Sequence, residues 1–180
     1  MSQLLVATTI VVWLVFAGAV AGKVRSRARL REFRQSLVAT GLVPQRWATA
    51  AAATVLAAET TTLALLLLTT PVGFALATMV MVGFSAGVWL VMRRGVRAAC
   101  RCFGGAGGPL SRIHLGRNLT LLGVSLTGLV ASLSTPALDL RSPVLLPVVV
   151  AAAVVAVLLI RVEDVAALAR PAAPRGVRRG

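Results

Sequence analysis

The sequence predicts an all-α, polytopic membrane helical bundle, and its composition and its apolar runs support that prediction. Hydrophobic residues make up 58% of the 180 residues and charged residues only 13%, and the mean hydropathy is +0.89. A soluble domain usually carries about a quarter charged residues, because its surface must remain hydrated. This chain has too few polar side chains to cover a soluble globule, which excludes a water-soluble function.

Five apolar runs are long enough, or nearly so, to cross a hydrocarbon core about 30 Å thick, for which a helix needs roughly 20 residues. Their continuous hydrophobicity favours helices over the alternating strands of a membrane barrel. The fifth run is the shortest and contains Pro147, so we expect it to cross with little tilt or to start with a kink. The runs are Gln3–Gly22, Trp47–Thr70, Pro71–Met92, Asn118–Leu138 and Val144–Ile160.

The basic residues predict how these helices are oriented. All but Arg141 of the 19 Lys and Arg residues fall in residues 23–46, in residues 93–117 or after the fifth run. Because positively charged segments stay in the cytoplasm, we expect an inner or plasma membrane protein with its N-terminus outside and its C-terminus inside. Anionic membrane lipids and topology then explain the net charge of +14, and nucleic-acid binding is not expected.

Segments outside the apolar runs have patterns of their own. Leu30, Phe33 and Leu37 recur at helical spacing with arginines on the other face, which predicts an interfacial helix over Val24–Gly41 on the inner leaflet. The basic tail over residues 163–180 is rich in Pro, Gly and Arg, which predicts disorder. The first apolar run has no basic residue before it, so we expect an uncleaved anchor and not a signal peptide.

Small residues recur at a spacing that allows two helices to approach closely. The patterns are Gly18-x-x-x-Gly22 and Gly83-x-x-x-Gly87. In a chain rich in Ala and Gly such patterns also arise by chance. They are compatible with a compact bundle and do not identify a dimer.

The two cysteines of the chain, Cys100 and Cys102, are separated by one residue. A disulfide between them would close a small, strained ring, and strain suits the transfer of oxidising equivalents better than the stapling of a fold. Arg97, Arg101 and Arg112 would favour the thiolate, and the neighbouring glycines would leave the loop accessible. The alternative is two ordinary loop cysteines, and the residues alone weigh the two interpretations about evenly.

A metal site is a weaker interpretation of the same segment. Cys100, Cys102 and His114, the only histidine, could together bind Cu(I) or Zn(II). Three ligands that include one distant histidine are a weak signal, because a histidine near a membrane surface more often has an interfacial or hydrogen-bonding role.

Glu59 is an acid near the middle of the second apolar run, among alanines and threonines. An ionised carboxylate facing lipid is costly, so we expect Glu59 to face the bundle interior. It could relay a proton or hydrogen-bond a quinone or another cofactor. Alternatively, it could only join helices through hydrogen bonds to the threonines or to a backbone carbonyl. The sequence contains no Ser/His/Asp set, phosphate loop or zinc-protease motif that would indicate a hydrolase.

These motifs, in this order, resemble the methylamine utilisation protein MauE family, a branch of the DoxX-like membrane proteins. The similarity covers roughly residues 5–135. It is sharpest at Cys100-Arg101-Cys102-Phe103-Gly104 followed by Arg117-Asn118-Leu119, with looser matches at Lys23 and Glu59. The resemblance implies a four-helix membrane core over residues 1–138, which leaves residues 139–162 as an additional membrane helix.

The resemblance also implies a function. The family is associated with maturation of the disulfide-rich small subunit of methylamine dehydrogenase, together with a thioredoxin-like protein. The role it implies is thiol–disulfide exchange by Cys100 and Cys102 during maturation of an exported redox protein. Glu59 would be a supporting polar group in the bundle. Many relatives lie outside methylamine pathways, so the resemblance does not imply the substrate.

The predicted topology conflicts with the function that the resemblance implies. Disulfides of exported proteins form outside the cytoplasm, whereas the basic residues place Cys100 and Cys102 inside. Either the pair exchanges electrons with a cytoplasmic thiol pool and the bundle passes them outward, which would need a quinone or a partner protein as a further carrier, or the loop dips into the membrane. A third option is that these cysteines have a non-redox role. The competing hypotheses are a non-catalytic membrane subunit or scaffold that docks a partner through its basic loops and, third, a metal-handling membrane protein.

Overall fold

The computed structural model describes residues 2–96, 112–134 and 144–168, the last six of these without their side chains. The regular structure in these ranges is entirely helical, as predicted. The helices are α1 (Ser2–Val24), α2 (Arg27–Ala39), the 3-10 turn η1 (Gln45–Trp47), α3 (Ala48–Leu68), α4 (Thr70–Arg93), α5 (Arg112–Ser134) and α6 (Leu145–Leu168).

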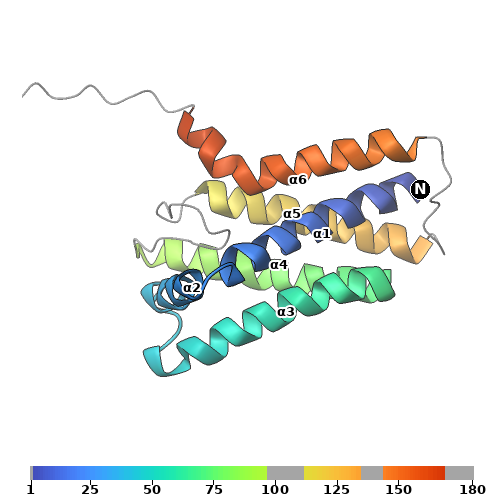
Figure 1. Cartoon of the computed structure of the whole chain (residues 1–180). Coiled ribbons are helices and arrows are strands. Elements are labelled where there is room, and N and C mark those ends of the chain that lie inside the picture. Colours follow the sequence, from blue (N-terminus) through green and yellow to red (C-terminus); the bar gives the residue numbers. More distant parts are fainter. Residues whose placement is uncertain (1, 97–111, 135–143, 169–180) are drawn as a thin grey trace, which may run out of the picture.

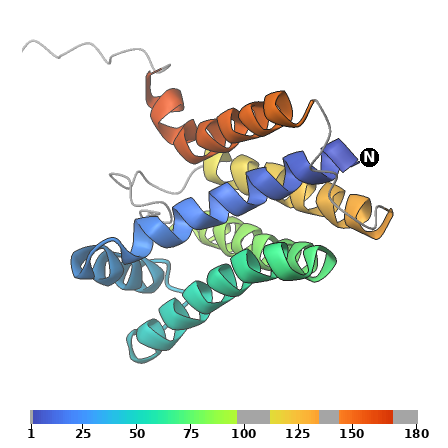
Figure 2. The ribbon, with the colours of Figure 1, turned by 45° about the vertical axis from the view of Figure 1, so that its right-hand side comes forward.

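The five long helices pack side by side in a bundle around α1 (Figure 1). α1 contacts α3, α5 and α6, while α4 packs between α3 and α5. The short helix α2 lies at one end of the bundle, against α1 and the start of α3, and Figure 2 shows α6 on the side of α1 away from α3. The buried core follows α1 through the bundle: Leu5, Val12, Val15 and Phe16 pack with Phe74, Ala77, Met81, Leu121, Ala131 and Ala156.

Four helices are long and apolar enough to cross a membrane: Ser2–Val24, Gln45–Leu68, Thr70–Arg93 and Leu145–Val162. The predicted count of five spans is therefore not confirmed. The remaining long helix, α5, is long enough but not apolar enough. Its first turns carry the polar residues Arg112, His114, Arg117 and Asn118. It begins six residues before the predicted run, and residues 135–138 at the other end of that run lie outside the described residues.

The predicted amphipathic helix is confirmed as α2, in a slightly shorter form. It begins after Ser26, whose hydroxyl accepts a hydrogen bond from a backbone N–H of the first turn at 3.2 Å. It ends just before Gly41, which has a φ of 70°. Phe33 is buried, and Leu30 and Leu37 are half-buried, so the predicted apolar face turns towards the bundle. Its place on the inner leaflet stays a prediction.

The two small-residue patterns have different surroundings. A Cβ built on Gly18 would lie 3.1 Å from Ile160 Cδ1, so α1 and α6 approach closely there. A Cβ built on Gly83 or Gly87 meets no atom of the described residues within 4 Å. The pattern on α4 therefore does not bring two of the described helices together.

Candidate functional site

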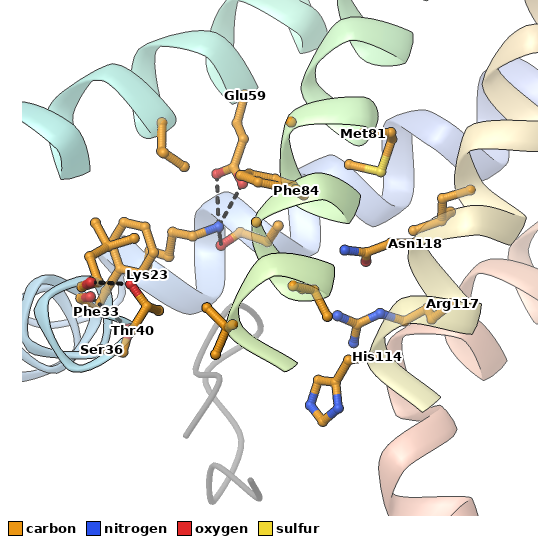
Figure 3. A pocket seen from close by; sticks show the side chains of 18 of the residues that line it. Lys23, Phe33, Ser36, Thr40, Glu59, Met81, Phe84, His114, Arg117 and Asn118 are labelled. Carbon is orange, nitrogen blue, oxygen red and sulfur yellow. Dashed lines mark hydrogen bonds and ion pairs between the residues drawn. The ribbon is translucent and has the colours of Figure 1, made fainter. Parts of the chain in front are cut away.

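A buried ion pair joins the end of α1 to the middle of α3. Lys23 Nζ lies 2.6 Å from Glu59 Oε1 and 2.9 Å from Oε2, and both side chains are only 1% exposed. The ammonium also lies 3.4 Å from the Ala19 carbonyl oxygen. The ring of Phe33 on α2 has its centroid 5.1 Å from Nζ, within the range of a cation–π interaction. The pair thus links three helices (Figure 3).

Helical periodicity explains why these two charges point inward. Lys23 follows Ala19 by four residues and Phe16 by seven, so it continues the buried stripe of α1. Glu59 likewise follows Ala52 by seven residues on the buried stripe of α3. A single charge in such a position would be strongly unfavourable, because burial removes its hydration. The opposite charge on the facing helix makes both positions tolerable.

The prediction that Glu59 faces the bundle interior is confirmed, and its hydrogen-bond partner is not one of the threonines that one interpretation offered. The carboxylate accepts hydrogen bonds from Lys23, whereas the nearby Thr62 donates to Ala58 O of its own helix at 2.8 Å. From the sequence, Lys23 is expected to be one of the basic loop residues that set the topology. The structure places it in the last turn of α1 with its ammonium turned inward. The missed signal was that the only lysine of the chain directly follows the first apolar run.

A cavity of about 160 Å³ lies beside the ion pair, bounded by α1, α2, α3, α4 and α5. Lys23 and Glu59 form one polar part of its wall. His114, Arg117 and Asn118 of α5 form another, and Figure 3 shows them across from the ion pair. Apolar side chains make up most of the remaining wall, among them Val15, Phe16, Val55, Met81, Phe84, Val88, Val91 and Leu121.

The polar wall of α5 is buried almost as deeply as the ion pair. His114 is 3% exposed, Arg117 5% and Asn118 6%. Residues three, four and seven positions apart share one face of a helix, so these three continue into the buried Leu121. In the sequence, Arg117 and Asn118 stand out as part of a motif, and Arg117 also as one of the basic residues that predict the topology. Their gathering with Lys23 and Glu59 depends on the packing of α5 against α1 and α4.

The predicted redox pair, Cys100 and Cys102, lies outside the described residues, in the connection between α4 and α5. The described residues contain no group of three His, Cys, Asp or Glu side chains that could hold a metal. The alternative metal set combines His114 with the two cysteines, so it stays untested. Val91 near the end of α4 and His114 near the start of α5 both line the cavity, so both ends of the connection lie beside it.

Comparison with known proteins identifies the family. No curated protein and no solved structure matches this chain significantly. The family model described as methylamine utilisation protein MauE matches residues 1–131. That range includes the Lys23–Glu59 pair and every residue that lines the cavity, and it confirms the resemblance seen in the motifs. With its long apolar helices, this chain is a multi-pass membrane protein that belongs to the MauE family of methylamine utilisation proteins.

Proposed function

We propose that this protein supports thiol–disulfide exchange during maturation of an exported redox protein, with Cys100 and Cys102 as the reacting pair. The proposal rests on where the segment that contains the two cysteines joins the helices. It joins the end of α4 to the start of α5, and both of these ends line the polar cavity. Arg93, Arg94 and Arg112 flank the segment and are exposed, so they would favour the thiolate form of a nearby cysteine.

The exchange itself needs only the two cysteines and a dithiol partner. One thiolate of the partner attacks a sulfur of the Cys100–Cys102 disulfide and forms a mixed disulfide. The second thiolate of the partner then attacks the partner's own sulfur in that bond, which releases Cys100 and Cys102 as thiols. Two electrons and two protons have then moved from the partner to the pair. A thioredoxin-like protein fits as the partner, because it presents such a dithiol on an accessible surface.

The proposed topology has the N-terminus outside and the C-terminus in the cytoplasm. α2, the end of α4 and the start of α5 lie at the same end of the bundle (Figure 1), so their basic residues could face one side of the membrane. In this arrangement α5 completes a four-helix core within residues 1–138, and α6 crosses as an additional helix. The electrons collected at the cytoplasmic side must then be passed to an acceptor.

Thiol trapping in cells tests this function. Cys100→Ser and Cys102→Ser should each abolish maturation of the exported protein, and one of them should accumulate a mixed disulfide with the partner on non-reducing gels. Thr127→Ser, on the exposed face of α5, is the matched control and should mature the partner normally. If both cysteines stay reduced and the double serine variant supports full maturation, the redox role is lost and the scaffold hypothesis takes its place.

Labelling of single cysteines tests the topology. An impermeant maleimide should label a Ser134→Cys variant of the cysteine-free protein in intact cells, because Ser134 is exposed at the far end of α5. The same reagent should leave Cys102 unlabelled until the membrane is permeabilised. Labelling of Cys102 in intact cells would overturn the cytoplasmic placement.

A further inference from the structure

The cavity beside the Lys23–Glu59 pair has the size of one aromatic ring. Its volume is about 160 Å³, and an apolar protein cavity of about 150 Å³ is known to bind benzene. Phe16, Met81 and Phe84 line its apolar part. Aromatic rings and a methionine thioether pack favourably against a flat ring, so this wall suits a planar apolar molecule better than a hydrated ion.

Asn118 indicates that the occupant carries a hydrogen-bond acceptor. Its side chain is 6% exposed and lines the cavity. Among the described residues no hydrogen bond of this amide is found, so its N–H groups can donate to a molecule in the cavity. Across the cavity, Lys23 donates hydrogen bonds to both carboxylate oxygens of Glu59 and a longer one, 3.4 Å, to the Ala19 carbonyl. An acceptor in the cavity would take the place of this longer hydrogen bond.

The helix α4 leaves a way into the cavity. Gly83 and Gly87 both line it, and a Cβ built on either meets open space among the described residues. Gly83 is exposed on the outside of the bundle. Since α4 is one of the helices able to cross a membrane, a lipid-soluble molecule could enter sideways past these two glycines and leave an apolar tail between them and the lipid.

We propose that this cavity binds a membrane-soluble quinone. Its ring would lie against Phe16 and Phe84, one carbonyl would accept a hydrogen bond from Asn118, and the other would face Lys23. Its isoprenoid tail would pass Gly83 into the membrane. A saturated acyl chain would fill the same space but would leave the Asn118 amide unpaired, so the quinone accounts for the apolar and the polar walls together.

The site deepens the proposed function and depends on it for its chemistry. Oxidation of the Cys100 and Cys102 thiols to their disulfide releases two electrons and two protons. The quinone takes up both electrons and both protons and becomes a hydroquinone, which would return the pair to its oxidising state. Binding itself does not involve the cysteines, so the two proposals can be tested separately.

Quinone binding can be measured on the full chain in nanodiscs made from quinone-free phospholipid, with ubiquinone-1 as the probe. The wild-type protein should bind it saturably at one site. Gly83→Leu should weaken binding about tenfold or more by blocking the entrance, and Asn118→Leu should weaken it about tenfold by removing the donor. Gly123→Leu is the matched control. Gly123 is an exposed helical glycine with open space at its Cβ, and it does not line the cavity.

The outcomes separate the two proposals. Absence of saturable binding to wild type, equal affinity in the Gly83→Leu and Gly123→Leu variants, or a phospholipid chain found in the cavity would overturn the quinone site. Gly83→Leu adds its side chain in open space and should therefore fold. Its affinity for ubiquinone-1 tests the quinone site even if Asn118→Leu fails to fold. The Cys100→Ser/Cys102→Ser variant should bind ubiquinone-1 like wild type. If it binds but still matures the partner, the thiol function fails and the quinone site stands.

Discussion

The helices α1 and α6 are both strongly apolar, yet they occupy opposite positions in the molecule. Both meet the requirements for a membrane span, but half of the apolar window of α1 is buried inside the protein, compared with 11% of that of α6. α1 lies in the middle of the bundle and α6 on its outside (Figure 1). Hydrophobicity therefore does not decide which helix becomes the centre.

The difference between the two helices lies in their polar residues. α1 buries Thr8, Thr9 and Lys23, whereas the buried residues of α6 within its described side chains are Ala152 and Ala156. Lipid chains are as apolar as leucine, so an apolar helix gains little by leaving them. A lysine gains much, because only the protein interior offers it a carboxylate. We infer that the Lys23–Glu59 pair helps to hold α1 inside the bundle, whereas small alanines form the buried face of α6 within its described side chains.

Removing the cation of α1 should have the largest effect on this arrangement. Lys23→Met leaves Glu59 buried without its partner and should lower the free energy of unfolding by about 3–5 kcal/mol. The double variant Lys23→Met/Glu59→Leu should recover most of the loss, since two apolar side chains can replace a buried pair. Unfolding by SDS in mixed micelles measures both. A double variant as unstable as the single one would show that the ion pair does not hold α1 in place.

A larger side chain on the inner face of α6 should have an intermediate effect. Ala156 is 0% exposed, so Ala156→Leu should cost about 1–3 kcal/mol by overpacking the contact with α1. Val157, on the next position, is 57% exposed, and the control Val157→Leu should change the same free energy by less than about 0.5 kcal/mol. Equal effects of the two variants would mean that α6 has no defined inner face.

The smallest effect is expected where the two helices touch at a glycine. The added Cβ of Gly18→Ala would meet the flexible end of Ile160 at 3.1 Å, a contact that a small rotation of that side chain relieves. The higher helix propensity of alanine, worth about 1 kcal/mol, offsets the remaining cost. We expect the unfolding free energy to stay within about 0.5 kcal/mol of wild type. A loss above about 2 kcal/mol would reveal a rigid approach of α1 to α6.

Several elements of the fold could be predicted because they depend on local pattern. The predicted runs Gln3–Gly22 and Pro71–Met92 agree with α1 and α4 to within two residues. Hydropathy was a poorer guide to where α5 begins, because this helix starts at Arg112 and includes His114, both before the apolar run. The backbone N–H and C=O groups of a helix bond to one another whether the side chains are polar or apolar, so the start of a helix need not coincide with the start of an apolar run.

The sequence predicted some of the residues of the candidate site, but it did not predict the contacts between them. Glu59 was recognised because an acid in an apolar run must find a partner inside the bundle. Its partner was not, since Lys23 looks from the sequence like the first basic residue of a loop. Thirty-six positions separate the two, and no local pattern sets the rotation of α1 relative to α3. The cavity wall of His114, Arg117 and Asn118 was missed for the same reason.

Composition and periodicity were therefore sufficient to predict an all-helical membrane protein, because both are properties of short stretches of chain, and the motifs carried the resemblance to the MauE family that the family model confirms. The meeting of Lys23 with Glu59, the cavity beside them and the central place of α1 were settled only by packing. Each depends on side chains from several helices, and in a membrane those helices are arranged by where a few polar groups can find one another.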